Sequence, residues 1–201
     1  MIRTTRVDGT APLPKCGDVG SATHPMARGA RDHGAARRSR RLEGGNIMTR
    51  THLPAIVGHV DDATVPWMDG GNHRYKLLRA ERASGLRVLR VQLPAGFRAP
   101  RHRHTADTIG FTLSGAWGYE EYGSRYEAQS LIYEPTGSIH TLVVFPDNAD
   151  VTDVVFIGRG GNMTLDDNDN VVAVSDTETL LEEYYQRCDA AGVPRPTHIE
   201  A

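Results

Sequence analysis

From residue 48 onward, the sequence is a succession of short apolar runs separated by turn residues. The runs are rich in Val, Ile, Leu, Tyr and Phe, and Gly, Pro, Asn or Asp lies between them. They cover residues 73–81, 86–93, 107–114, 129–134, 140–145 and 151–157. Short strands at such near-regular spacing are typical of a β-sandwich or a small barrel, so this part of the chain is predicted to be all-β.

One segment near the C-terminus has helical periodicity instead. Ser175 and Glu178 have the spacing of a capping box, and Gly192 followed by Pro194 is a typical helix end. The residues between them that share one helical stripe are Leu180, Leu181, Tyr184, Tyr185, Cys188 and Ala191. We expect an amphipathic helix docked on the barrel, with Cys188 as a packed thiol rather than a nucleophile.

The first 47 residues differ in composition from the rest. They contain none of the chain's 13 Phe, Trp and Tyr residues, and they carry nine Lys or Arg against four Asp or Glu. A segment without aromatic side chains buries too little surface to offset its chain entropy. We therefore expect residues 1–47 to be a disordered extension, or the product of a start assigned upstream of Met48. Residues 48–201 then form a single domain.

Composition excludes several functional classes. The net charge of −2 does not suit a nucleic-acid-binding chain, and no apolar stretch approaches 18 residues, so no membrane span is expected. Cys16 and Cys188 are too far apart for a disulfide framework. Two isolated cysteines fit a reducing compartment, so a cytoplasmic location is expected.

Two histidine-containing blocks supply the candidate metal ligands. His102 and His104 are two residues apart on an extended segment, so their side chains point to the same face. The first block spans residues 96–115, from a Gly through the histidine pair to a second Gly, and the second spans residues 135–140 and ends at His140. Both resemble the motifs of the cupin superfamily, a double-sheet jelly-roll barrel. The resemblance implies that His102, His104 and His140 meet around a metal ion; the alternative is a barrel that has lost its metal.

The sequence departs from the superfamily pattern at three positions. The usual Glu ligand is replaced by Thr108, a Gly by Gln129 and an Asn by Val144. Three neutral imidazoles without a carboxylate leave a divalent ion with its full charge, which favours a substrate that chelates as an anion. Fe(II) with open positions suits oxygenase chemistry, whereas Zn with one water suits hydrolysis or hydration. The spacing does not distinguish Fe(II) from Zn, Ni or Mn.

A closer resemblance covers about residues 60–185. The Tyr-Glu-Pro-x-Gly-x-x-His-Thr-Leu block at residues 133–142 is its most specific part, and it is similar to the 2,4'-dihydroxyacetophenone dioxygenase family, which is related to acetylacetone-cleaving dioxygenases. This resemblance implies a mononuclear Fe(II) enzyme. Such an enzyme uses O2 to split a carbon–carbon bond next to a carbonyl in a hydroxyketone or diketone, and a hydroxyketone yields two carboxylic acids.

Four further residues are assigned to the site. Glu134 is predicted to be the general base, the alternative being a carboxylate at the barrel rim paired with an Arg. Tyr119 is predicted to orient the substrate through its hydroxyl, the alternative being an ordinary barrel tyrosine. Trp117 and Thr108 are assigned to substrate binding, although Trp117 also suits a buried core.

Other functions and an oligomer remain open at this point. A tri-histidine cupin could be a hydrolase or isomerase, or a non-catalytic ligand-binding or sensor cupin. Strand 107–114 places Ile109, Phe111 and Leu113 on the face opposite the metal-facing residues. Three large apolar side chains on the outside of a barrel need a cover. We expect a homodimer to supply it; the C-terminal helix is the alternative.

Overall fold

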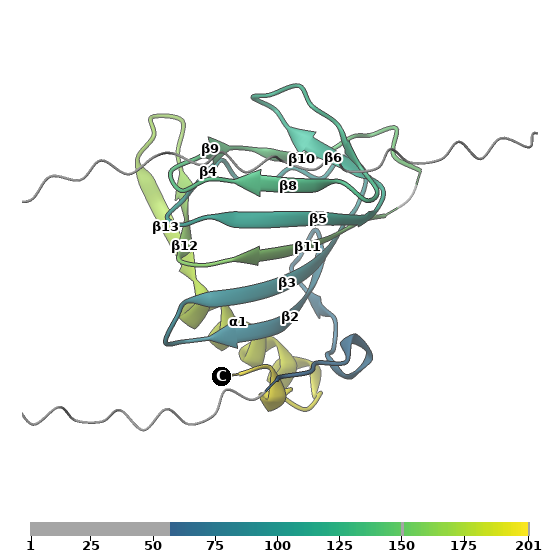
Figure 1. Cartoon of the computed structure of the whole chain (residues 1–201), viewed down its shortest axis with the longest axis vertical. Helices are drawn as coiled ribbons and strands as arrows, with labels where there is room; N and C mark the ends of the chain where they lie inside the picture. The colour runs from purple at the N-terminus through teal and green to yellow at the C-terminus, as the bar shows by residue number, and fades with distance from the viewer. Residues whose placement is uncertain (1–56, 150, 201) are drawn as a thin grey trace, which may run out of the picture. The chain divides into compact units, whose positions relative to one another are not determined.

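The computed structural model describes residues 57–149 and 151–200, so the expected extension 1–47 and the boundary at residue 48 lie outside the described residues. All strand pairs between the named strands are antiparallel. The largest sheet has the order β1 (Met68–Asp69), β2 (Arg74–Glu81), β3 (Leu86–Leu93), β11 (Thr152–Gly158), β5 (Thr108–Ser114) and β8 (Leu131–Glu134). Figure 1 shows this sheet face-on.

Two smaller sheets complete the barrel. One has the order β13 (Val171–Asp176), β12 (Gly161–Leu165), β4 (His102–His104) and β9 (Ile139–His140), and the other has the order β10 (Leu142–Val144), β6 (Ala116–Tyr119) and β7 (Tyr126–Glu127). Strands of all three sheets line one interior cavity, which confirms the predicted double-sheet barrel. Two short 3-10 helices, η1 (Asp62–Thr64) and η2 (Thr197–Ile199), flank the barrel strands in the chain.

Two apolar clusters hold these elements together. Inside the barrel, Leu93, Trp117, Ile132, Val144 and Val154 join strands of the large sheet to β6 and β10. Outside it, the helix α1 (Thr177–Ala191) packs against β1 and β2, and the buried face of the helix consists of Thr177, Leu181, Tyr184, Tyr185 and Cys188. The docked helix and the packed thiol are therefore confirmed. No helix in residues 57–149 and 151–200 is long and apolar enough to cross a membrane.

The helix begins one residue later than the sequence pattern predicts. The N-cap is Asp176, whose carboxylate accepts from the Thr179 amide while the Thr179 hydroxyl accepts from the Asp176 amide. Ser175 belongs to β13 and remains in its ladder, so the expected Ser175 and Glu178 capping box is wrong. The C-terminal prediction is confirmed, because Gly192 adopts φ 66°, the left-handed conformation of a helix C-cap.

The strand prediction is right for the long strands and incomplete for the short ones. The expected run 86–93 is β3 without change, whereas the run 140–145 is divided into β9 and β10, which belong to different sheets. The sequence analysis did not identify β1, β6, β7, β12 or β13. Strands of two to six residues carry too little local pattern, and partner strands decide whether they form.

Gln129 occupies a superfamily Gly position and has the conformation that Gly favours. Its φ is 69°, in the left-handed region that costs a residue with a Cβ about 1–2 kcal/mol. Its side chain is exposed, so a substitution removes little packing. We expect Gln129→Gly to raise the free energy of unfolding by about 1 kcal/mol in urea denaturation. Gln186→Gly, at an exposed position inside α1, is the control and should lower it by about 0.5–1 kcal/mol. If Gln129→Gly instead destabilised the protein, the left-handed backbone at Gln129 would not be strained.

The outer face of β11, β5 and β8 is apolar and uncovered by α1 (Figure 1). The alternation expected for strand 107–114 is confirmed, since Thr108, Gly110 and Thr112 are buried and the residues between them are exposed. The exposed large apolar side chains on this face, here the outer patch, are Ile109, Phe111, Leu113, Leu131, Tyr133 and Ile157. They are 38–66% exposed, which amounts to roughly 500 Å² of surface when a large side chain offers about 150–250 Å².

We propose that a second copy of the chain covers the outer patch. Its area supplies most of the roughly 800 Å² per partner that a stable interface buries, and closed two-fold dimers are the commonest oligomers. Light scattering should give a multiple of 22.0 kDa, and Phe111→Lys should shift the mass to that of the monomer. Val172→Lys, on exposed β13, should leave the dimer intact. A monomeric wild type, or dissociation by Val172→Lys alone, would contradict the assignment.

Candidate metal centre

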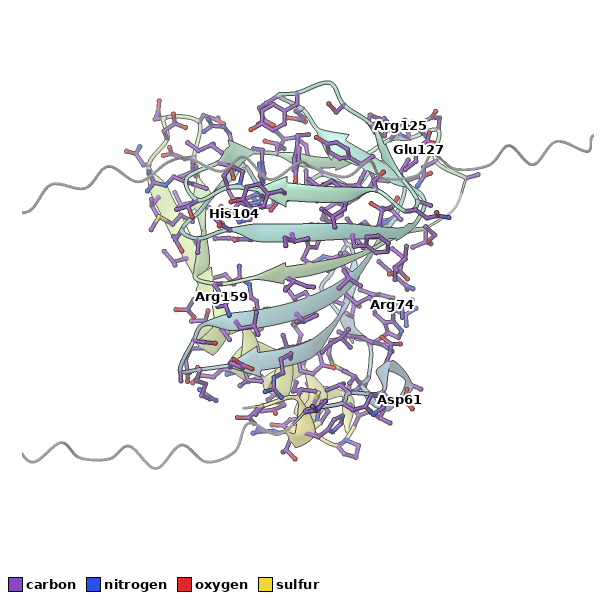
Figure 2. The ribbon with its side chains drawn as sticks, in the orientation of Figure 1. Asp61, Arg74, His104, Arg125, Glu127 and Arg159 are labelled. Atoms are coloured by element: carbon purple, nitrogen blue, oxygen red, sulfur yellow. The ribbon has the colours of Figure 1, made fainter. Side chains whose placement is uncertain are left out.

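Three imidazole rings converge inside the barrel because of strand register. His102 and His104 lie on one face of β4, and His140 of β9 stands directly opposite His102 in the antiparallel ladder. The ring centroids of the three histidines are 4.8–5.0 Å apart, and their ligand atoms all lie within 4.8 Å of one another. In Figure 2, His104 lies toward the end of the barrel at which β12 and β13 are found.

Neighbouring groups orient two of the rings. His102 Nδ1 lies 2.9 Å from the Pro100 carbonyl, which only accepts, so Nδ1 carries the proton and Nε2 keeps its lone pair. The Thr108 hydroxyl lies within hydrogen-bonding distance of His104 Nδ1, at 3.2 Å. Burial lowers the pKa of His102, and it lowers that of His140 to about 4, so both rings are neutral near pH 7.

The spacing of the His104 and His140 rings fits one divalent ion. His104 Nε2 and His140 Nε2 are 3.1 Å apart. Two nitrogens that bind one ion at about 2.1 Å each, at angles of 90–109°, are about 3.0–3.4 Å apart. Neutral imidazoles held by outer hydrogen bonds are also the usual form of histidine metal ligands. His102, His104 and His140 are therefore suited to hold a single ion through nitrogen ligands.

A carboxylate stands beside the three rings. Glu134 Oε2 lies 3.0 Å from His104 Nε2, and Glu134 Oε1 lies 4.0 Å from His140 Nε2. The Tyr119 hydroxyl donates to the other side of this carboxylate, and its ring stacks on His140 with centroids 4.1 Å apart. Burial alone would raise the pKa of Glu134, but its hydrogen bonds to His104 and Tyr119 and the nearby charges lower it overall. Glu134 is thus a buried, ionised carboxylate.

The rings open into a cavity of about 280 Å³, large enough for a small organic molecule. Its polar lining includes the three histidines, Thr108, Tyr119 and Glu134. Most of its remaining wall is apolar and consists of Leu89, Val91, Leu93, Phe97, Leu142 and Phe156. The site therefore combines three imidazoles and a carboxylate with an apolar surface that would exclude water from most of a bound ligand.

Comparison with known proteins agrees with this architecture. The ChrR cupin-like domain family matches residues 56–159, more than half of the chain. The chain belongs to this cupin family. A comparison with curated proteins gives no significant match.

Solved structures give the same fold. An RmlC-like cupin protein from Ralstonia eutropha JMP134 is 28% identical and has a TM-score of 0.68, with 71% of this chain and 94% of that chain covered. A putative acetylacetone dioxygenase from Methylibium petroleiphilum PM1 is 19% identical with a TM-score of 0.58, covering 66% and 98%. An acetylacetone dioxygenase from Acinetobacter johnsonii is 20% identical with a TM-score of 0.57, covering 69% and 96%. At these two lower identities the likeness shows the cupin fold.

The structure corrects two expectations about this cupin. Trp117 is fully buried in the barrel cluster and donates to Thr112, and it is not part of the described cavity wall, so it is a core residue rather than a substrate contact. Glu134 is not a rim carboxylate paired with an Arg, because it is 4% exposed and bonded to Tyr119 and His104. Glu134 itself, expected in the site as the base, lies beside Thr108, which occupies the position of the usual Glu ligand.

Strand register brings Glu134 next to Thr108. Thr108 on β5 stands directly opposite Glu134 on β8, and both side chains point into the barrel. A carboxylate thus stands on the adjacent strand at the same level of the sheet. Thr108 lines the cavity as well, but its hydroxyl is engaged with His104 Nδ1.

The sequence analysis missed one charged residue of the cavity, Arg87. It alternates on β3 with Leu89, Val91 and Leu93, and all four line the cavity. A single cation on an otherwise apolar strand face was the available signal. By contrast, Arg90 lies on the other face of β3 and is paired with Asp62 and Asp153.

Proposed function

We propose that this cupin is a mononuclear Fe(II) dioxygenase that uses O2 to cleave a carbon–carbon bond next to a carbonyl in a small hydroxyketone or diketone. The observation that carries the proposal is the cluster of three imidazoles with the Glu134 carboxylate beside it in an apolar cavity. The acetylacetone dioxygenases with the same fold support the choice of reaction class. The 2,4'-dihydroxyacetophenone-like substrate rests on the resemblance of residues 133–142.

The chain's own residues would hold the ion, bury the substrate and remove a proton from it. The Nε2 atoms of His102, His104 and His140 would hold the ion on one side and leave its other positions facing the cavity. When bound, Fe(II) supplies Lewis acidity toward the carbonyl and the capacity to react with O2. The wall around Leu89, Val91 and Phe156 would bury the rest of the substrate and exclude water.

Glu134 would remove the proton from the carbon next to the carbonyl. It lies beside the position where the ion would be held, and its lowered pKa keeps it unprotonated and ready to accept. Tyr119 would act as a positioning residue, because its hydroxyl donates to Glu134. Burial, and then the negative charge of Glu134, raise the pKa of Tyr119, so it stays a neutral donor.

Oxygen uptake by the metal-loaded protein tests the proposal. The protein is prepared without metal and loaded in turn with Fe(II), Zn, Ni and Mn, then mixed with a panel of β-diketones and hydroxyacetophenones. We expect uptake of one O2 per substrate consumed with Fe(II). The products should be two carboxylic acids from an α-hydroxyketone, and one carboxylic acid plus one α-dicarbonyl compound from a β-diketone. Turnover without O2 uptake would indicate a hydrolase or isomerase. Metal and ligand binding without any turnover would indicate a sensor cupin, and either result would refute the dioxygenase.

A further inference from the structure

Arg87 is a buried cation that no carboxylate among residues 57–149 and 151–200 neutralises by direct contact. Its side chain is 6% exposed, and it donates to the Gly160 carbonyl and, at 3.1 Å, to Asn162 Oδ1. Both acceptors are neutral and use two of the five N–H donors of the guanidinium. Among the described residues, Asp176 and Glu134 act on it only as charges at a distance. A buried charge without a counter-ion is costly, so a residue of this kind commonly serves to bind an ion.

Strand register places Arg87 at the same level of the barrel as the histidine cluster. Across the large sheet, Arg87 pairs with Gly158, Gly158 with Thr108, and Thr108 with Glu134. These four residues form one row, and every member lines the cavity. Neighbouring strands are about 4.8 Å apart, so the row places Arg87 and Glu134 at opposite ends of the space that a small ligand would occupy.

Gly158 lies between Arg87 and Thr108 in this row, and it has no side chain to fill the space beside Arg87. A Cβ at Gly158 would lie 2.7 Å from the Thr108 hydroxyl oxygen, and the missing side chain leaves room between Arg87 and the histidines. The sheet that contains β12 and β4 also connects Arg87 to the histidines. Asn162 of β12 accepts from Arg87, and it stands directly opposite His104 of β4. Two independent strand pairings therefore lead from Arg87 to the histidine cluster.

We propose that Arg87, with Asn162 beside it, binds a carboxylate group of the substrate, so that this cupin acts on carbonyl compounds that carry a carboxylate away from the reacting carbonyl. The proposal rests on the proposed function for the role of the carbonyl, but the anion site itself needs no metal. A guanidinium recognises a planar carboxylate through two parallel N–H···O bonds, and the apolar cavity strengthens this pairing. The apolar wall between the two ends suits an aryl or alkyl body.

Binding of a matched pair of probes to the metal-free protein tests the site. The probes are 4-acetylbenzoate and 4-acetylbenzamide, which have nearly the same shape and differ in charge. Calorimetric titration should give an affinity for the carboxylate about 10- to 100-fold higher than for the amide, as expected for a hydrogen-bonded buried charge. Arg87→Gln should reduce this ratio to below about threefold, whereas Arg87→Lys should retain part of it.

Arg79→Gln is the matched control, because Arg79 lies on neighbouring β2, pairs with Glu81 and does not line the cavity. It should keep the wild-type ratio. Equal affinity of the wild type for the two probes would overturn the proposal without any variant, even when Arg87→Gln fails to fold. An unchanged ratio in folded Arg87→Gln would overturn it as well. A carboxylate preference in a protein that never consumes O2 would instead leave the anion site standing and refute the dioxygenase.

Discussion

Replacing His104 by alanine will weaken metal binding by more than about 100-fold while the protein remains folded. His104 Nε2 lies 3.1 Å from His140 Nε2 and 3.0 Å from the Glu134 carboxylate, so its loss removes one of the three nitrogens of the cluster. Changes to groups that only support a metal ligand already cost about 10- to 100-fold in affinity, and removal of a ligand should cost more. His102→Ala and His140→Ala should act in the same direction. Metal content per chain after dialysis, measured by mass spectrometry, is the readout.

Controls separate loss of the metal from loss of the fold. His104→Gln keeps most of the side-chain volume, and circular dichroism of the metal-free variants should match that of the metal-free wild type. His59→Ala changes an exposed histidine far from the cluster in sequence and should keep one ion per chain. Retention of stoichiometric metal by all three cluster variants would show that the ion binds elsewhere, or that the barrel binds none specifically.

Replacing Glu134 by glutamine will lower turnover by about 10²- to 10⁴-fold, the usual contribution of a general base. The substitution keeps the shape of the side chain and an acceptor for the Tyr119 hydroxyl, but it removes the group that accepts the proton. The metal content should stay at the wild-type value. The experiment measures both quantities on the same preparation, with the carbonyl compound that gives the fastest O2 uptake.

Two further variants test whether the loss of turnover comes from the loss of a general base. Tyr119→Phe removes the hydrogen bond to Glu134 and should shift the acidic limb of the pH–rate profile upward, because the carboxylate loses a group that lowers its pKa. Glu127→Gln, on exposed β7 at the opposite end of the sheets from His104 (Figure 2), should change neither rate nor metal content. Loss of metal in Glu134→Gln would make Glu134 a ligand rather than the base, and an unchanged rate would exclude both roles.

The features of the fold that were predicted correctly depend on local backbone geometry. In a strand, alternate side chains point to opposite faces whatever the partner strands are. This rule placed His102 and His104 together, and it separated exposed Phe111 from buried Thr108 and Thr112 on β5. The helix was predicted for the same kind of reason, since its buried stripe and its terminal Gly192 lie within one continuous segment. Its N-cap was misplaced by one residue because β13 holds Ser175 in its ladder.

By itself, therefore, the sequence determined which side chains share a face of each long strand and, through its two motif blocks, which histidines belong together. Only the tertiary structure decided what lies across from them: Glu134 reaches His104 because β8 pairs with β5, and Arg87 joins their level because β3 pairs with β11. It likewise placed Trp117 in the core instead of the cavity. The physical reason is that strand neighbours and register depend on packing between segments far apart in the chain, and a shift of one residue would turn every side chain of a strand to the other face.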